Sequence, residues 1–146
     1  MNKAIIVTGT PGTGKSTFSK KLAKEENLIY LDVNKVIDKL DFKFDKKRDC
    51  KIVDIKKLNK EIIKLIKDSE KTLVIDSHLS HYIQNKYIKK CFVCKCDIKI
   101  LRNRLKKRKY SKDKIEENIE AEIMDVCLNE AKENKHKIEI INTSKS

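Results

Sequence analysis

The chain has 146 residues, of which 39% are hydrophobic and 39% charged, and its formal net charge is +13. This length and composition suit one folded domain, residues 1–146, and exclude both a disordered chain and a multidomain protein. No apolar run approaches the roughly 18 to 20 residues needed to cross a bilayer, and the N-terminus lacks the pattern of a signal peptide. We therefore expect a cytoplasmic protein without a membrane partner.

Strand and helix patterns alternate along the first half of the sequence. Short apolar runs beside turn residues indicate buried strands, and apolar residues spaced three or four apart indicate helices. The elements expected are, in chain order, a strand at 4–7, a helix at 15–24, a strand at 28–31, a helix from its cap Asp32 to Ile37, and a helix capped by Asp54 with a stripe of Ile55, Leu58, Ile62 and Leu65. Residues 41–50 are charged and lack periodicity, which predicts an exposed and mobile connection.

The second half continues the same alternation. The elements expected are a strand at 72–76, a strand at 91–96, a helix capped by Asp97 and faced by Ile98, Leu101 and Leu105, a longer helix after Ser111 with Ile115, Ile119, Ile123, Cys127 and Ala131 on one face, and a strand at 137–142. Strands that alternate with helices predict an α/β fold, in which a five-stranded parallel sheet is covered by helices on both faces.

Residues 9–16, Gly-Thr-Pro-Gly-Thr-Gly-Lys-Ser, match the Walker A pattern between a predicted strand and a predicted helix. All three glycines of the chain lie here, which indicates a loop whose backbone N–H groups wrap a phosphate. Lys15 would reach the β- and γ-phosphates of ATP, and the Ser16 hydroxyl would ligate Mg²⁺. A glycine-rich turn with a chance lysine is the weaker alternative. The residues expected to hold the nucleotide are Gly9, Pro11, Gly12, Thr13, Gly14, Lys15, Ser16 and Thr17.

Two further candidates follow the third predicted strand. Asp76 stands at its carboxyl end, where a Walker B carboxylate would hold Mg²⁺ or orient the acceptor. The alternative is an aspartate that only caps the next turn. His78 is open to two interpretations, a proton shuttle or a hydrogen-bonded structural residue, and we expect His81 to be structural.

Arg104 and Arg108 lie four residues apart in a basic stretch at 86–114, which has thirteen basic and two acidic residues. Arginine forks bind phosphate oxygens in pairs, so these two residues are candidates for neutralising the transferring phosphate. The alternative is a solvated helix face. The basic stretch also suits a phosphate-rich ligand or an RNA-rich partner, although a lysine-rich surface alone would explain it.

The five cysteines are odd in number and unevenly spaced, which favours free thiols over a disulfide framework. Cys91, Cys94 and Cys96 resemble part of a metal site, but no second Cys or His pair stands at the spacing of a tetrahedral zinc site. A buried strand with thiols as small apolar side chains is the favoured interpretation.

Taken in order, five stretches resemble the small adenylate kinases of the adenylate kinase isoenzyme-6 type. They are residues 9–16, Asp49-Cys-Lys-Ile-Val-Asp54, Val74-Ile-Asp-Ser-His-Leu-Ser-His81, Arg104-Leu-Lys-Lys-Arg-Lys-Tyr-Ser111 and Lys114-Ile-Glu-Glu-Asn-Ile-Glu-Ala-Glu-Ile123. The resemblance implies a three-layer P-loop kinase fold, with a monophosphate-binding segment at about 31–60 and a lid at about 104–114. It also implies that Lys15, Asp76, His78, Arg104 and Arg108 form the catalytic set.

The same resemblance implies transfer of a phosphate from ATP to AMP, and relatives also act as ATPases that bind a ribosomal protein of the small-subunit platform. Three departures stand out. Lys109 replaces a usual glycine, Asp38-Lys39 lies where some relatives carry an adenylate-binding arginine, and the sequence stops soon after the last strand, so one surface of the sheet should be less covered. The favoured hypothesis is an adenylate kinase; the alternatives are a ribosome-assembly ATPase, a kinase for another small acceptor, and a nucleotide-gated binding module.

Overall fold

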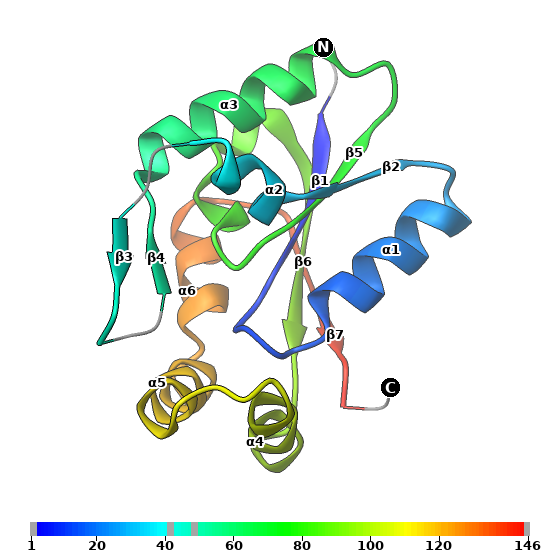
Figure 1. Cartoon of the computed structure of the whole chain (residues 1–146). Helices are drawn as coiled ribbons and strands as arrows, with labels where there is room; N and C mark the ends of the chain where they lie inside the picture. Colours follow the sequence, from blue (N-terminus) through cyan, green and yellow to red (C-terminus); the bar gives the residue numbers. More distant parts are fainter. Residues whose placement is uncertain (1–2, 41–42, 48–49, 145–146) are drawn as a thin grey trace.

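The computed structural model describes residues 3–40, 43–47 and 50–144, and its centre is a five-stranded sheet (Figure 1). The strands, in their order across the sheet, are β2 (Ile29–Asp32), β5 (Leu73–Asp76), β1 (Ala4–Thr8), β6 (Ile88–Lys95) and β7 (Ile138–Asn142). Every pair is parallel, as predicted. Since β1 lies in the middle, the loop that follows it opens at the centre of the carboxyl edge.

Helices cover both faces because the side chains of the strands alternate between two apolar clusters. Ile5 and Val7 pack on the face covered by α1 (Lys15–Glu25), together with Ala23 and Phe92. Ile6 points to the opposite face, which is covered by α2 (Val33–Asp38), α3 (Ile55–Asp68) and α6 (Val126–Glu133). The three-layer α/β arrangement expected from the sequence is confirmed.

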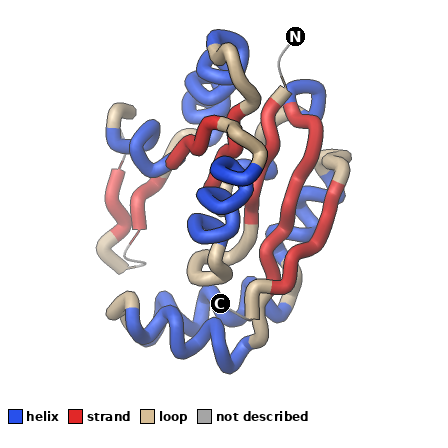
Figure 2. The backbone as a smooth tube through the Cα atoms, turned by 90° about the vertical axis from the view of Figure 1, so that its right-hand side faces the viewer, coloured by secondary structure: helices blue, strands red, loops and turns tan. Residues whose placement is uncertain are grey.

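Two further helices lie side by side at one end of the molecule, α4 (Ile98–Lys107) and α5 (Lys112–Ile123), as both backbone views show (Figures 1 and 2). They share an apolar cluster of their own, made by Cys96, Leu101, Leu105, Ile115 and Ile119. Together they form a compact unit beside the carboxyl edge of the sheet, and we call it the α4–α5 unit.

Side-chain caps begin several helices where the sequence predicts them. Asp32 accepts a hydrogen bond from the Asn34 N–H (2.9 Å), and Asp54 accepts one from the Lys56 N–H (3.0 Å). Asp97 is the N-cap residue of α4, yet its side chain makes no capping bond, so the prediction of a cap there is wrong in that respect.

Two apolar stripes differ from the prediction. On α3 the buried stripe is Leu58, Ile62 and Ile66, at steps of four, which leaves Leu65 40% exposed. The long helix expected after Ser111 is broken, because Asp125 adopts a left-handed conformation (φ 52°) between α5 and α6. The break turns Ile123 outward, where it is 61% exposed.

The charged stretch expected to be an irregular connection contains a small hairpin. Strands β3 (Lys43–Asp45) and β4 (Cys50–Ile52) pair antiparallel, apart from the main sheet. The expected exposure holds for most of residues 43–47, but the strand pairing was not predicted, because cross-strand pairing is a non-local contact that a run of lysines and aspartates does not signal. Residues 41, 42, 48 and 49 lie outside the described part, and mobility there stays a prediction.

Strand β7 forms one edge of the main sheet and carries Ile140, which is 54% exposed. Within the described ranges, no helix has the length and apolar character required to cross a lipid bilayer.

Candidate nucleotide-binding site

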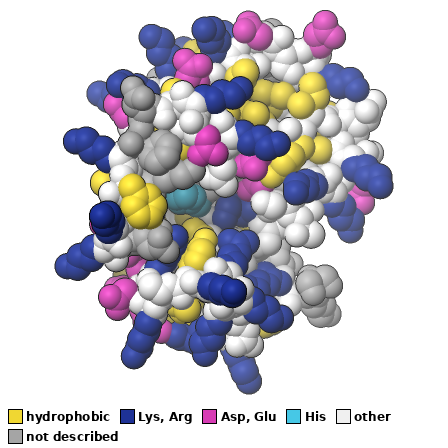
Figure 3. Space-filling view, viewed as in Figure 1, with side chains coloured by type: hydrophobic (Ala, Val, Ile, Leu, Met, Phe, Trp, Pro, Cys, Tyr) yellow, Lys and Arg dark blue, Asp and Glu magenta, His cyan; other side chains and the backbone are white. Residues whose placement is uncertain are grey.

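A cavity of about 730 Å³ opens at the carboxyl edge of the sheet. The space-filling view shows it as a hollow with a histidine inside, and Lys and Arg side chains gather on the surface below it (Figure 3). Its lining comes from the loop after β1, the end of β5, the segment 34–55, and the helices α5 and α6. Ligand sites of parallel α/β sheets lie at this edge, so the topology alone selects this cavity.

The Walker A loop folds around the carbonyl oxygen of Thr10. This oxygen accepts hydrogen bonds from the Thr13 N–H (3.2 Å), the Thr13 hydroxyl (2.6 Å) and the Lys15 ammonium (3.2 Å). Gly12 has φ 91°, and a Cβ there would lie 2.9 Å from side-chain carbons of Leu101 and Leu105. Glycine is therefore required both by the backbone conformation and by the close approach of α4.

The loop leads directly into α1, whose N-cap is Gly14 (φ 84°). No side chain caps this helix, so its first N–H groups are not held by a capping carboxylate or hydroxyl. A helix N-terminus of this kind attracts anions, and it faces the cavity together with Lys15 and Ser16.

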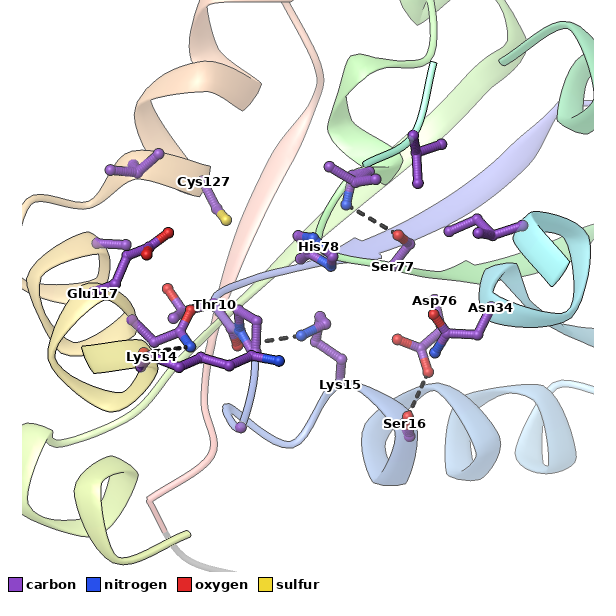
Figure 4. Close-up of a pocket in the computed structure, with 18 of the residues that line it drawn as sticks. Thr10, Lys15, Ser16, Asn34, Asp76, Ser77, His78, Lys114, Glu117 and Cys127 are labelled. Atoms are coloured by element: carbon purple, nitrogen blue, oxygen red, sulfur yellow. Dashed lines mark hydrogen bonds between the residues drawn. The ribbon is translucent and has the colours of Figure 1, made fainter. Parts of the chain in front are cut away.

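Lys15 and Asp76 both line the floor of the cavity, where the Lys15 ammonium is turned toward Thr10 and the Asp76 carboxylate toward Ser16 (Figure 4). Burial among protein atoms lowers the pKa of the Lys15 ammonium, and the nearby Asp76 carboxylate opposes this shift. The Asp76 carboxylate, 6% exposed, accepts a hydrogen bond from the Ser16 hydroxyl (2.7 Å). Hydroxyl and carboxylate oxygens are the hard ligands that Mg²⁺ prefers, so this pair fits the ion expected from the motif.

Tyr30 is a member of this site that sequence reasoning missed. Its hydroxyl donates to the same Asp76 oxygen that Ser16 reaches, at 2.7 Å. Strand β2 pairs with β5 so that Tyr30 lies opposite Val74, two residues before Asp76, and the two side chains share one face of the sheet. The signal was available only once the order of the strands was known.

His78 lines the cavity next to Lys15, as expected. The residue is exposed, yet the surrounding protein atoms and the charge of Lys15 both lower the pKa of its imidazole, the protein atoms more strongly. The ring is therefore neutral at pH 7. Its proton-shuttle role stays a prediction.

His81 is enclosed, in agreement with a structural role. Its Nδ1 lies 2.7 Å from the Thr8 hydroxyl, and its Nε2 lies 3.2 Å from a Glu130 carboxylate oxygen. Its carbonyl accepts from His136 Nε2 (2.8 Å), and Glu130 also accepts from the Tyr82 hydroxyl. This chain of bonds ties the end of β1 to α6.

The two candidate arginines are placed differently. Arg108 lines the cavity, near Tyr110 and Lys114 of the α4–α5 unit. Arg104 does not line it; its guanidinium donates to the Thr143 carbonyl (2.6 Å) and the Gly12 carbonyl (3.4 Å). The expectation that both arginines reach into the phosphate site together is not met here. Arg104 is instead held against the Walker A loop and Thr143, whereas Arg108 is the exposed C-cap residue of α4.

The sequence of this chain is similar to a protein-family model and to several known proteins. A family model described as an AAA domain matches residues 5–125. A "Putative adenylate kinase" of Methanocaldococcus jannaschii is 39% identical over 140 residues, which cover 94% of this chain and 77% of that protein. An "Adenylate kinase isoenzyme 6 homolog" of Caenorhabditis elegans is 34% identical over 131 residues, which cover 88% of this chain and 72% of that protein. The chain belongs to the family of small adenylate kinases of the isoenzyme-6 type.

Solved structures share the fold of this adenylate kinase family at low sequence identity. A sugar kinase from Janibacter superposes with a TM-score of 0.67 at 11% identity, over 100% of this chain and 88% of that one. A gluconokinase from Sinorhizobium meliloti gives 0.61 at 9% identity, over 99% and 85%. These likenesses confirm the P-loop kinase fold and carry no information on the acceptor.

The acceptor end of the cavity differs from the end that the Walker A loop forms. In the described part of this adenylate kinase-like chain, the segment expected to bind the monophosphate contributes neutral and apolar lining residues: Asn34, Ile37, Phe44, Val53 and Ile55. The described cations that line the cavity come from the Walker A loop and the α4–α5 unit: Lys15, Arg108 and Lys114. Positive charge is thus concentrated where the polyphosphate of a donor would lie.

The two cysteines of β6 and Cys96, which follows the strand, are buried in three different apolar clusters, and this agrees with the buried-strand interpretation. Cys91 faces the α3 side, Cys94 faces the α1 side, and Cys96 belongs to the α4–α5 unit. Burial raises the pKa of the Cys91 and Cys94 thiols to about 12. Among the described residues, no group of three or more His, Cys, Asp or Glu side chains is arranged to hold a metal ion.

Proposed function

We propose that this protein catalyses Mg²⁺-dependent transfer of the terminal phosphate of ATP to AMP, which yields two molecules of ADP. The observation that carries the proposal is the cavity floor, which Lys15 of the Walker A loop lines together with the hydrogen-bonded Ser16–Asp76 pair. The cavity of about 730 Å³ is within the range of small-molecule sites. The names of the relatives, adenylate kinases among them, support the same activity.

Each residue has a separate role in this proposal. Lys15 and the N-terminus of α1 bind the β- and γ-phosphates, and Thr13, Ser16 and Thr17 surround them. Mg²⁺ would be held by Ser16 and Asp76, and when bound it neutralises the polyphosphate and fixes its orientation. Tyr30 keeps the Asp76 carboxylate in place through its hydrogen bond.

The α4–α5 unit supplies the remaining positive charge. Arg108 lies at the cavity wall and would bind the phosphate during transfer, when negative charge spreads over its equatorial oxygens. Arg104 would support the Walker A loop through its hydrogen bond to the Gly12 carbonyl. His78, which lines the cavity near Lys15, would accept the proton of an attacking water or acceptor.

A second candidate function is an ATPase that acts in assembly of the small ribosomal subunit. It is favoured by the acceptor end of the cavity, whose described lining lacks a cation for the AMP phosphate. Asp38 stands on α2 where an adenylate-binding arginine is expected from the resemblance. In this function the partner is a ribosomal platform protein, the basic stretch 86–114 lies near RNA, and the location is cytoplasmic.

One experiment separates the two. Purified protein is incubated with Mg-ATP with and without AMP, and ADP and free phosphate are both measured, with Lys15→Ala as a control for contaminating enzymes. ADP that forms mainly when AMP is added, without free phosphate, supports the kinase. ADP and phosphate that form regardless of AMP refute it in favour of the ATPase.

A further inference from the structure

Glu122 is an acidic residue of α5 that the proposed chemistry does not use. Its residue exposure is 4%, although a carboxylate is costly to bury without partners. It does not line the cavity, so it does not bind the nucleotide itself. Its burial is therefore explained by the groups that its carboxylate contacts.

Three groups from two other segments surround the Glu122 carboxylate. One oxygen accepts from the Thr10 hydroxyl (2.9 Å) and pairs with the Lys95 ammonium (2.9 Å), and the other accepts from the Cys96 N–H (2.9 Å). Lys95 is itself held by Asp125 (2.6 Å) and by the Glu122 carbonyl (3.0 Å). The carboxylate is thus fixed between the end of β6 and the Walker A loop.

The Thr10 contact ties Glu122 to the shape of the loop. The carbonyl of Thr10 is the acceptor around which the loop folds, with donors from Thr13 and Lys15. A hydrogen bond that holds the side chain of Thr10 also restricts the orientation of its peptide groups. Glu122 therefore acts on the residue that sets the resting position of the Lys15 ammonium.

The position of Glu122 on α5 adds a second consequence. Helix α5 packs on α4 through Leu105, Ile115 and Ile119, and the same unit carries Arg108 and Lys114 into the cavity wall. Any movement of α5 against the sheet would shift the carboxylate that holds Thr10. The loop and the wall that closes over it are thereby linked by one buried side chain.

We propose that Glu122 is a positioning residue, which holds the Walker A loop in its phosphate-binding conformation through the Thr10 hydroxyl. The conformation of the loop then depends on the position of α5 relative to the sheet. The inference rests on nucleotide binding by this loop, which the proposed function shares. The alternative is that Glu122 only stabilises the fold, by balancing the partly buried charge of Lys95.

The test measures the dissociation constant for Mg-ATP by equilibrium titration, together with the thermal unfolding midpoint of each variant. Thr10→Val removes the hydroxyl at nearly constant volume, Thr10→Ser retains it, and Glu122→Gln removes the charge. Glu120→Gln is the matched control, since Glu120 is an exposed carboxylate on the same helix. We expect Thr10→Val and Glu122→Gln each to weaken Mg-ATP binding about tenfold, and Thr10→Ser and Glu120→Gln to bind within about twofold of the parent chain.

The double variant tests the route. This variant carries both Thr10→Val and Glu122→Gln. If Glu122 acts through Thr10, its dissociation constant for Mg-ATP should be close to that of Glu122→Gln alone. If the two residues act independently, the two fold-changes in the dissociation constant should multiply. Unchanged Mg-ATP binding by Thr10→Val, or multiplied losses in the double variant, would overturn the proposal. If Glu122→Gln fails to fold, the dissociation constants of Thr10→Val and Thr10→Ser for Mg-ATP are compared, and equal values overturn the proposal. Because binding needs no acceptor, a chain that binds ATP without phosphorylating AMP refutes the proposed function and leaves this inference standing.

Discussion

Substituting Lys109 by glycine should stabilise this protein, although lysine is the better helix former. Lys109 follows the C-cap of α4 and has φ 61°, a left-handed conformation that disfavours a residue with a Cβ. The Lys109 N–H bonds to the Lys106 carbonyl (2.9 Å), and the Tyr110 N–H bonds to the Leu105 carbonyl (3.4 Å). This pair of bonds is a Schellman motif, in which the left-handed position is most often glycine.

The size of the effect follows from two opposing terms. The left-handed conformation costs a residue with a Cβ about 1 to 2 kcal/mol, and glycine relieves this cost. Glycine also loses more backbone entropy on folding, which offsets roughly 0.5 to 1 kcal/mol. Because the Lys109 side chain is exposed, no packing is lost. We therefore expect a net gain of about 0.5 to 1 kcal/mol, or about 2 to 4 °C in the unfolding midpoint.

The chain offers matched controls. Lys135 has φ 59° and ends α6 with the same two bonds, from its own N–H to Lys132 (3.0 Å) and from the His136 N–H to Ala131 (3.2 Å), so Lys135→Gly should also stabilise. Lys106→Gly, inside α4, should instead destabilise by about 1 kcal/mol. Urea and thermal unfolding of the three variants measure these changes. A lower midpoint for Lys109→Gly, comparable with that of Lys106→Gly, would refute the backbone argument.

The remaining predictions concern the site and the pH dependence. Arg108→Ala should lower kcat by about 100-fold or more and weaken Mg-ATP binding far less, because its charge matters most during transfer; an unchanged kcat would contradict this role. Asp76→Asn should raise the Mg²⁺ concentration needed for half-maximal activity about tenfold or more, and an unaltered Mg²⁺ titration would exclude Asp76 as a ligand. Burial lowers the pKa of His136, so the unfolded chain binds that proton more readily and the free energy of unfolding should fall as the pH drops below about 6.5. Urea unfolding at a series of pH values should show a shallower fall for His136→Gln, and an identical fall in both chains would argue against this residue.

The sheet and the phosphate-binding loop were predictable because their signals are local. The run at 4–7, the three glycines and Lys15 lie within twelve residues, and each indicates the same strand, loop and helix. Asp76 was identified for a similar reason, since a carboxylate at the end of a buried strand has few places to lie other than the open edge of the sheet. The Ser16 hydroxyl bond to it agrees with that placement.

The residues that sequence reasoning missed or misplaced depend on contacts between distant segments. Tyr30 is 46 positions from Asp76 and Thr10 is 112 positions from Glu122, and neither pairing follows from periodicity. Arg104 and Arg108 look equivalent at a spacing of four, but Arg104 is held by the carbonyl of Thr143, 39 positions away, and only Arg108 lines the cavity. The hairpin of β3 and β4 was missed because its pairing outweighs a local composition that favours an open loop.

The distribution of glycine connects these observations. Within the described chain, Asn27, Lys109 and Lys135 all hold left-handed positions at helix ends where glycine would cost less, while Gly9, Gly12 and Gly14 stand in the Walker A loop. At a helix end, a side chain in the left-handed conformation costs only backbone strain, because the side chain points into water. At Gly12 a Cβ would also lie 2.9 Å from the Leu101 and Leu105 side chains of α4, so these side chains would have to shift in addition to the loop. Gly12 therefore stands where the Walker A loop meets α4, and Glu122 of α5 contacts the same loop through Thr10.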